Sequence, residues 1–238
     1  MDPTGFTPLK KTTLAQRASA QILDHIRQQR LAGGDSLPSE SKLSEVLGVS
    51  RTVVREALHL LQGQGVIQML NGRSAEVRPI DSEVLQVYFR HALQTLDSSL
   101  IELMEVRRGL EAEAARLCAL RRDETQLADL RTILAKMETA TEPKAYSEHD
   151  TQFHLAIARY SGNTVLLQLI LALRQGLREA AVLGLKRRKN SDGFASVSAR
   201  HREIVHAIAS ADPVAATQAM FRHMDEAISF LVGMDEDK

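Results

Sequence analysis

The spacing of apolar residues changes at Gly65, and this change constrains the front of the chain more than any other feature. Beyond Gly65, two short apolar runs at 66–70 and 74–77 flank the dipeptide Asn71-Gly72. Asn-Gly between two such runs predicts a β-hairpin, because both residues tolerate a positive φ angle. Before Gly65, apolar residues three and four apart predict helices at 14–29, 40–47 and 51–64. Three helices and a hairpin are the order of a winged helix-turn-helix, which we expect at residues 1–80.

Two serines mark the starts of the second and third predicted helices. Ser39 and Ser50 each precede a helix, where the hydroxyl accepts a hydrogen bond from a backbone N–H of the first turn. Arg51 and Arg55 lie one turn apart at the start of the third helix and share a face. In a winged helix-turn-helix this end of the helix faces base edges in the major groove, where arginine contacts guanine. The pattern therefore predicts DNA binding.

Other residues of this region favour the same interpretation. The hydroxyls of Ser50 and Thr52 are placed to donate to phosphates, helped by the helix N-terminus. Arg73 follows the hairpin turn, so it would reach from the wing toward the minor groove or the backbone. The alternative is that Arg51 and Arg55 are ordinary solvated helix positions. The hairpin and the capped helix before it favour DNA binding, because they place both arginines on the helix that the motif inserts.

The charge of the chain is divided unevenly. The whole sequence has 30 basic and 30 acidic side chains, a balance that by itself argues against a nucleic-acid partner. Up to Ile80, however, there are 10 basic and 7 acidic residues, and beyond it 20 and 23. A basic front and an acidic remainder indicate different partners. A single cysteine, Cys118, excludes an intrachain disulfide, and no apolar run approaches the ~18 residues of a membrane span. We expect a cytoplasmic protein with no membrane partner.

Residues 81–238 have no pattern typical of a strand. Apolar residues three and four apart predict helices at 82–94, 98–121, 123–140, 144–160, 163–188, 195–210 and 212–233. Breaks between them contain turn residues such as Asp212-Pro213. A bundle of six or seven helices over this length can bury a core of its own. The expected fold class is mainly α, an N-terminal winged helix-turn-helix followed by an all-α bundle.

Four residues of this bundle have the chemistry of metal ligands. Asp150 and His154 lie four apart on one predicted helix and so share a face, His201 begins the next-to-last helix, and His223 lies in the last. A carboxylate and three imidazoles from three helices suit a divalent transition metal, zinc first, with nickel or manganese as alternatives. The alternative for each histidine is an ordinary surface position. Apolar neighbours of His154 and His223 favour the buried interpretation.

The front of the chain also carries a family resemblance. Its motifs are Leu-Pro-Ser-Glu at 37–40, the run at 47–58, Gly65-Val66-Ile67 and Asn71-Gly72-Arg73. Over about residues 12–78 they resemble the DNA-binding domain of the GntR family of bacterial transcription regulators. The resemblance implies that the DNA contacts are made by Ser50, Arg51, Thr52, Arg55 and Gly72. Where the family usually has an arginine that touches DNA this chain has Ser41, followed by Lys42. Either Lys42 substitutes for it, or the operator lacks that contact.

A second resemblance covers the bundle. The stretches at 105–111, 150–154, 161–163 and 201–204, together with His223, resemble the helical ligand-binding (FCD) domain of the FadR subfamily, in its metal-binding branch. The resemblance implies that Asp150, His154, His201 and His223 bind the metal. It further implies that a small organic acid binds there as effector and that Arg107 points into its pocket. The residues alone allow another role for Arg107, an ion pair with Glu111 four positions on.

Together the resemblances identify the chain as a ligand-responsive transcription regulator. Its simplest form is a repressor that binds a pseudo-palindromic operator as a homodimer. Sugar acids, hydroxy acids and dicarboxylates all fit the chemistry of the expected effector. Two alternatives use the same ligands: a metal-sensing repressor, and a metal-dependent enzyme acting on small organic acids. The sequence places no further carboxylate or histidine as a general base, which argues against the enzyme.

Overall fold

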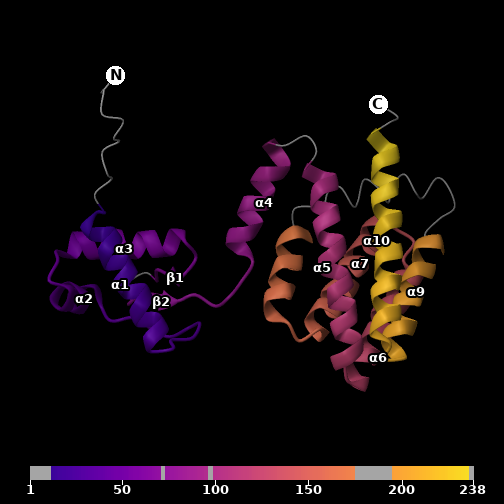
Figure 1. Cartoon of the computed structure of the whole chain (residues 1–238), viewed down its shortest axis with the longest axis horizontal. Coiled ribbons are helices and arrows are strands. Elements are labelled where there is room, and N and C mark those ends of the chain that lie inside the picture. Colours follow the sequence, from indigo (N-terminus) through magenta and orange to yellow (C-terminus); the bar gives the residue numbers. More distant parts are fainter. Residues whose placement is uncertain (1–11, 71–72, 96–98, 175–194, 236–238) are drawn as a thin grey trace, which may run out of the picture. The chain divides into compact units, whose positions relative to one another are not determined.

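The computed structural model describes residues 12–70, 73–95, 99–174 and 195–235, which are mainly helical with one small sheet (Figure 1). The chain divides into two compact units, Met1–Val84 and Leu85–Lys238. The mainly α fold class predicted from the sequence is confirmed. Among the described helices, none is both long enough and apolar enough to cross a membrane.

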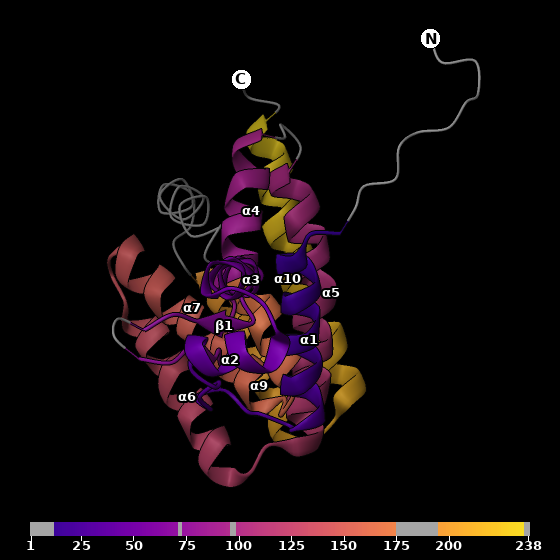
Figure 2. The same cartoon turned by 90° about the vertical axis from the view of Figure 1, so that its left-hand side faces the viewer.

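Helices α1, α2 and α3 pack together in the N-terminal unit (Figures 1 and 2). They span Leu14–Gln28, Glu40–Leu47 and Arg51–Gly63. The hydroxyls of Thr13, Ser39 and Ser50 cap them, each accepting a hydrogen bond from a backbone N–H of the first turn. Gly48 ends α2 in the left-handed conformation, at a φ of 63°. The two serine caps expected from the sequence are therefore present.

The core of this unit lies between α1 and α3. Val54, Leu58 and Leu61 of α3 are at most 1% exposed, as the apolar spacing predicts. On α1, apolar residues four apart at 14, 18, 22 and 26 predict one buried face, yet Leu14 is 54% exposed. Ala15 is buried in its place, because the buried face of α1 runs through residues 15, 18, 22 and 26, and residue 14 lies about 100° away around the helix.

The predicted hairpin is present but shorter than expected. Strand β1 (Ile67–Gln68) pairs antiparallel with β2 (Glu76–Val77), and Ile67 lies opposite Val77. A third segment extends this sheet on the other side of β2. There Leu37 donates its N–H to the Ala75 carbonyl at 2.7 Å, and the Val77 N–H is donated to the Asp35 carbonyl at 2.8 Å. The wing is thus fixed to the connection between α1 and α2. The predicted turn residues at 71–72 lie outside the described residues.

The C-terminal unit is a helical bundle. Its helices are α4 (Glu83–Thr95, which begins in the N-terminal unit), α5 (Ser99–Arg121), α6 (Glu124–Thr139), α7 (Pro143–Tyr160), a segment at residues 164–174, α9 (Ala195–Ala209) and α10 (Pro213–Asp235). Helices α5 and α10 run side by side, and α9 packs against both (Figure 1). Of the helix predicted at 163–188, residues 175–188 lie outside the described residues.

Candidate functional site

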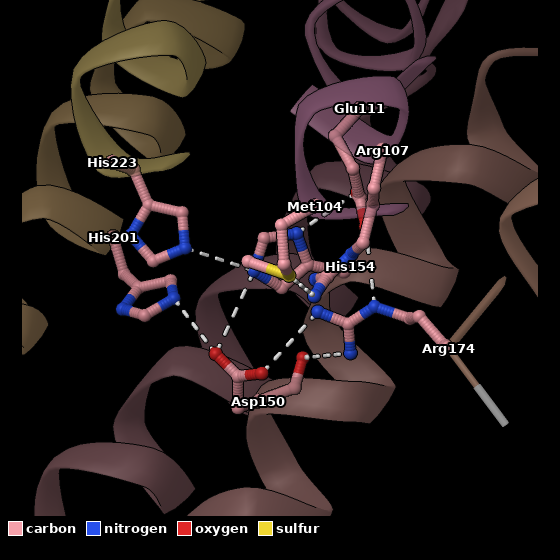
Figure 3. A network of polar contacts seen from close by, with 8 residues as sticks. All are labelled: Met104, Arg107, Glu111, Asp150, His154, Arg174, His201 and His223. Atoms are coloured by element: carbon pink, nitrogen blue, oxygen red, sulfur yellow. Dashed lines mark hydrogen bonds and ion pairs between the residues drawn. The ribbon is translucent and has the colours of Figure 1, made fainter. Parts of the chain in front are cut away.

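The structure brings Asp150, His154, His201 and His223 together in the bundle. One ligand atom from each lies within 4.8 Å of the others, and the three histidines are buried (Figure 3). Helix α7 supplies Asp150 and His154 one turn apart, α9 supplies His201, and α10 supplies His223. The Oδ1 atom of Asp150 lies 3.2 Å from His201 Nε2 and 3.6 Å from His154 Nε2. His154 Nε2 lies 3.2 Å from His223 Nε2. The predicted residues therefore form one cluster.

Aromatic packing holds the imidazole rings in this cluster. The side chain of Phe153 is fully buried, and its ring lies edge-on to those of His154 and His201, with centroids 5.7 and 5.1 Å away. The rings of His201 and His223 are 4.4 Å apart. Because Phe153 precedes His154 on α7 and its ring contacts that of His201 on α9, it links two of the three helices that carry the cluster. Rings fixed in this way have their nitrogens directed before any ligand arrives.

The electrostatics of the cluster favour the metal-binding forms of Asp150 and His223. Burial acts to raise the pKa of Asp150, but charge and hydrogen bonding from His154, a hydrogen bond from His201, and the charge of Arg174 hold that pKa well below its usual value. The pKa of His223 is also well below its usual value, because the ring is buried and lies beside His201 and His154. An ionised carboxylate and a neutral imidazole are the forms that bind a metal ion.

Beside this cluster lies a second network, formed by Arg107, Glu111 and Arg174 (Figure 3). Arg107 Nε donates to Glu111 Oε1 at 2.9 Å, so the intrahelical pair that the residues allowed is present. Arg174 Nε donates to the same oxygen at 3.2 Å, and the other oxygen of Glu111 lies 2.9 Å from His154 Nδ1. Burial acts to raise the pKa of Glu111, but the charges of His154, Arg107 and Arg174 hold it well below its usual value.

Sequence reasoning treated Glu111 only as a partner of Arg107 and missed Arg174. The i,i+4 spacing from Arg107 was a signal for Glu111, but it gave no reason to connect Glu111 with His154, which lies 43 positions away. Arg174 had no motif or spacing to mark it. What distinguishes both is burial: Glu111 is 0% and Arg174 7% exposed, a rare environment for charged side chains.

The chemistry of the donor set fits a divalent transition metal. Three imidazole nitrogens and one carboxylate oxygen suit zinc, nickel or manganese, whereas calcium prefers oxygen ligands alone. Among the described residues, this is the one group of histidine, cysteine and carboxylate side chains compact enough to hold an ion. His149 and His206 lie outside it.

At the second candidate site, the N-terminal end of α3, the predicted side chains are on the surface. Ser50, Arg51, Thr52 and Arg55 are all exposed. Arg55 is held by Glu40 of α2, with Nη2 to Oε2 at 2.8 Å and Nε to Oε1 at 3.3 Å. The hydrogen bonds from Arg55 and the charges of Arg55 and Arg51 lower the pKa of the Glu40 carboxyl. Together they outweigh burial, which acts to raise that pKa.

Four further positions of the N-terminal unit were singled out from the sequence. Arg51 Nη2 donates to Ser41 Oγ at 2.8 Å, so the residue that departs from the family pattern contacts one of the predicted DNA-reading arginines. Lys42 forms an exposed ion pair with Glu45 of the same helix, at 3.0 Å. Arg73 is exposed beyond the hairpin turn, and Gly72 lies outside the described residues.

Comparison with known proteins finds a family match in each of the two units. Residues 14–77 match the model of the bacterial regulatory proteins of the gntR family, and residues 102–226 match the FCD domain. The HTH-type transcriptional regulator LutR of Bacillus subtilis is 30% identical over 89% of this chain and 98% of its own length. An Escherichia coli regulatory protein named for the L-lactate dehydrogenase operon is 28% identical over 94% of this chain and 90% of its own. A Streptococcus agalactiae GntR structure matches with a TM-score of 0.67 and 26% identity, covering 90% of this chain and 99% of that one. The chain therefore belongs to the GntR family, in its FadR-like subfamily, as a DNA-binding transcriptional regulator with a C-terminal FCD domain and not as an enzyme.

Proposed function

We propose that this regulator binds operator DNA through residues 1–80 and responds to a small organic acid bound at a divalent metal within residues 81–238. The single observation that carries the proposal is the convergence of Asp150, His154, His201 and His223 within 4.8 Å in the bundle. The E. coli relative named for a lactate dehydrogenase operon supports a carboxylic acid as the effector class.

In this proposal DNA is read from the N-terminal end of α3. Arg51 and Arg55 contact bases, while Ser50 and Thr52 contact phosphates close to the helix N-terminus. Gly72 and Arg73 contact DNA from the wing, and Lys42 of α2 contacts the DNA backbone. Gly72 lies outside the described residues, and the other six are all exposed in the structure, which supports their availability. A homodimer places two copies of α3 about one DNA turn apart on a pseudo-palindromic operator.

The metal centre receives the effector. Asp150, His154, His201 and His223 hold the ion, for which zinc is the first candidate and nickel or manganese the alternatives. When bound, the metal supplies a Lewis-acidic centre to which a carboxylate can bind. Arg107 is buried beside the cluster, where its guanidinium can form a charge-assisted pair with that carboxylate. Its present partner is Glu111, so the effector carboxylate would share Arg107 with Glu111.

In this proposal the protein is a cytoplasmic repressor, and binding of the effector releases it from the operator. A ligand shifts the equilibrium between two states only by its difference in affinity for them. The effector must therefore bind more tightly to the state with the lower affinity for DNA.

Two experiments test these claims separately. Operator sequences selected from random DNA are used in gel-shift assays with wild type, Arg51→Ala and Arg55→Ala. Unchanged affinity of both variants would remove the DNA-reading assignment. Zinc-loaded protein is then screened by thermal shift against sugar acids, hydroxy acids and dicarboxylates, because a ligand that binds the folded state raises its apparent stability. The effector assignment fails if His201→Ala responds to the same acid as strongly as wild type does.

One observation favours metal sensing as a second candidate. Four protein donors are enough to complete a tetrahedral zinc site without any exogenous ligand. In that case chelation alone changes operator affinity, and added organic acids have no further effect. Gel shifts with and without a chelator, each repeated with the acid selected by thermal shift, distinguish the two mechanisms.

A further inference from the structure

Glu111 is the centre of the polar network beside the proposed metal site (Figure 3). It is fully buried on α5, and both oxygens of its carboxylate have partners. Oε2 lies 2.9 Å from His154 Nδ1, and Oε1 accepts from Arg107 Nε at 2.9 Å and from Arg174 Nε at 3.2 Å. A buried ion network of this kind is weak evidence for stability, because desolvation offsets most of the attraction.

The contact with His154 determines where that ring carries its proton. An ionised carboxylate only accepts hydrogen bonds, so the hydrogen between Glu111 and His154 must be on Nδ1. In the neutral ring the lone pair is then on Nε2. His154 Nε2 is the nitrogen that faces the cluster, 3.2 Å from His223 Nε2 and 3.6 Å from Asp150 Oδ1. Glu111 thus selects the tautomer that can ligate an ion at the centre of the cluster.

Arg174 orients the carboxylate of Asp150. Its Nη2 donates to Asp150 Oδ2 at 3.3 Å and its Nη1 to the Asp150 backbone carbonyl at 3.4 Å. These contacts occupy one carboxylate oxygen and leave Oδ1 directed at His201 and His154. Since Arg174 also donates to Glu111, the orientation of both ligands depends on one connected group.

We infer that Glu111 is a positioning residue of the metal centre, which fixes the ligating tautomer of His154 and, through Arg174, the monodentate orientation of Asp150. The inference rests on the proposed metal site and goes beyond its four ligands. Outer partners of this kind raise the basicity of ligating histidines and fix their rings, and their loss costs about 10- to 100-fold in metal affinity.

Glu111→Gln in the full-length chain is the informative substitution. Glutamine keeps the volume and still offers an oxygen to Arg107, but its amide now donates toward His154 Nδ1 and so favours the opposite tautomer. We expect zinc affinity, measured by competition with a chromophoric chelator, to fall by about 10- to 100-fold. Glu113→Gln is the matched control, because Glu113 lies on the same helix in a half-exposed pair with Arg116 and has no contact with the cluster. Its zinc affinity should equal that of wild type.

A direct readout of the tautomer separates positioning from a merely structural role. Two-bond proton–nitrogen NMR correlations of metal-free wild type, at mildly alkaline pH and assigned with His154→Gln, should show the proton of His154 on Nδ1. A proton on Nε2 overturns the inference, even if Glu111→Gln fails to fold. So does a folded Glu111→Gln protein with unchanged zinc affinity. Wild-type protein that takes up no zinc would instead overturn the proposed metal centre, and this inference with it.

Discussion

Gly33 and Gly34 are adjacent in the connection between α1 and α2, and the structure assigns them different reasons for being glycine. A Cβ atom on Gly33 would lie 2.6 Å from Pro79 Cα and 2.9 Å from Pro79 N. Gly34 has open space within 4 Å of such an atom but a φ of +98°. Alanine at Gly33 is therefore a purely steric perturbation, and alanine at Gly34 a purely conformational one.

The magnitudes of the two perturbations are similar although their causes differ. Overpacking against Pro79 backbone costs about 1–3 kcal/mol, because main chain cannot move aside as a flexible side chain does. A positive φ at a non-glycine residue costs roughly 1–2 kcal/mol. In both variants alanine lowers the conformational entropy of the unfolded chain, which offsets about 0.4–1 kcal/mol of the lost stability. We therefore expect Gly33→Ala and Gly34→Ala each to lose about 1 kcal/mol or slightly more in local stability.

Asparagine distinguishes the two causes, because it tolerates positive φ but carries a Cβ. Gly34→Asn should recover part of the stability lost in Gly34→Ala, while Gly33→Asn should be no better than Gly33→Ala. Hydrogen-exchange mass spectrometry on peptides from residues 14–77 measures the local opening free energy without assuming that the two units unfold together. Equal tolerance of asparagine at both positions, or a neutral Gly33→Ala, would refute the reasoning.

The same pair links the connection to DNA binding. Pro79 follows β2, the strand that carries the wing, and the Gly34 N–H is donated to the Val77 carbonyl at 2.9 Å. Displacement of Pro79 by Gly33→Ala should shift the wing. At matched loss of stability, we expect Gly33→Ala to weaken operator binding more than Gly34→Ala does.

Three further predictions concern the C-terminal unit. With free zinc at about 100 times its Kd, bound metal adds about 2.7 kcal/mol, so a chelator should lower the Tm of this unit by roughly 5–10 °C, and His201→Ala should abolish that difference. Cys118 is fully buried and burial raises its pKa to about 12, so a thiol reagent at neutral pH should react with it only after denaturant is added. Arg122 donates to the carbonyls of Ile208 and Ala209 at the end of α9 at 3.3 and 2.7 Å. Arg122→Gln should therefore lower the free energy of unfolding, from urea titration, by about 1.5–3 kcal/mol.

The parts of the fold that were predictable from the sequence have local causes. Caps such as Ser39 and Ser50, and apolar spacing such as that of Val54 and Leu58, act within one or two turns of the residue itself. The same locality explains the error at Leu14. Near a helix end, a few apolar residues do not determine which of two adjacent positions faces the core, and packing of α1 against α3 decides it. Element boundaries and strand lengths depend on such tertiary contacts, so β1 and β2 came out shorter than their apolar runs.

The candidate metal centre was predictable for a similar reason, and its surroundings were not. Asp150 and His154 share a helical face, which spacing alone reveals. His201 and His223 were candidates because their imidazoles lie on two further predicted helices, and the resemblance implied the same four ligands. The link from Glu111 to His154 joins α5 to α7 and has no period in the sequence. A buried charged network of this kind follows from how helices pack.

Ser41 shows how the structure changes the meaning of a departure from a family pattern. The resemblance posed a choice between Lys42 as a substitute contact and an operator without that contact. In the structure Lys42 is paired with Glu45, while Ser41 accepts a hydrogen bond from Arg51. An arginine at position 41 would place a second cation beside Arg51, whereas serine provides an acceptor that orients it. Bidentate recognition of guanine depends on the orientation of the guanidinium. Serine in place of arginine at position 41 therefore removes one cation but helps to orient Arg51. Under the proposed DNA-reading role of Arg51, we therefore expect the departure to change specificity at one base more than total affinity for DNA.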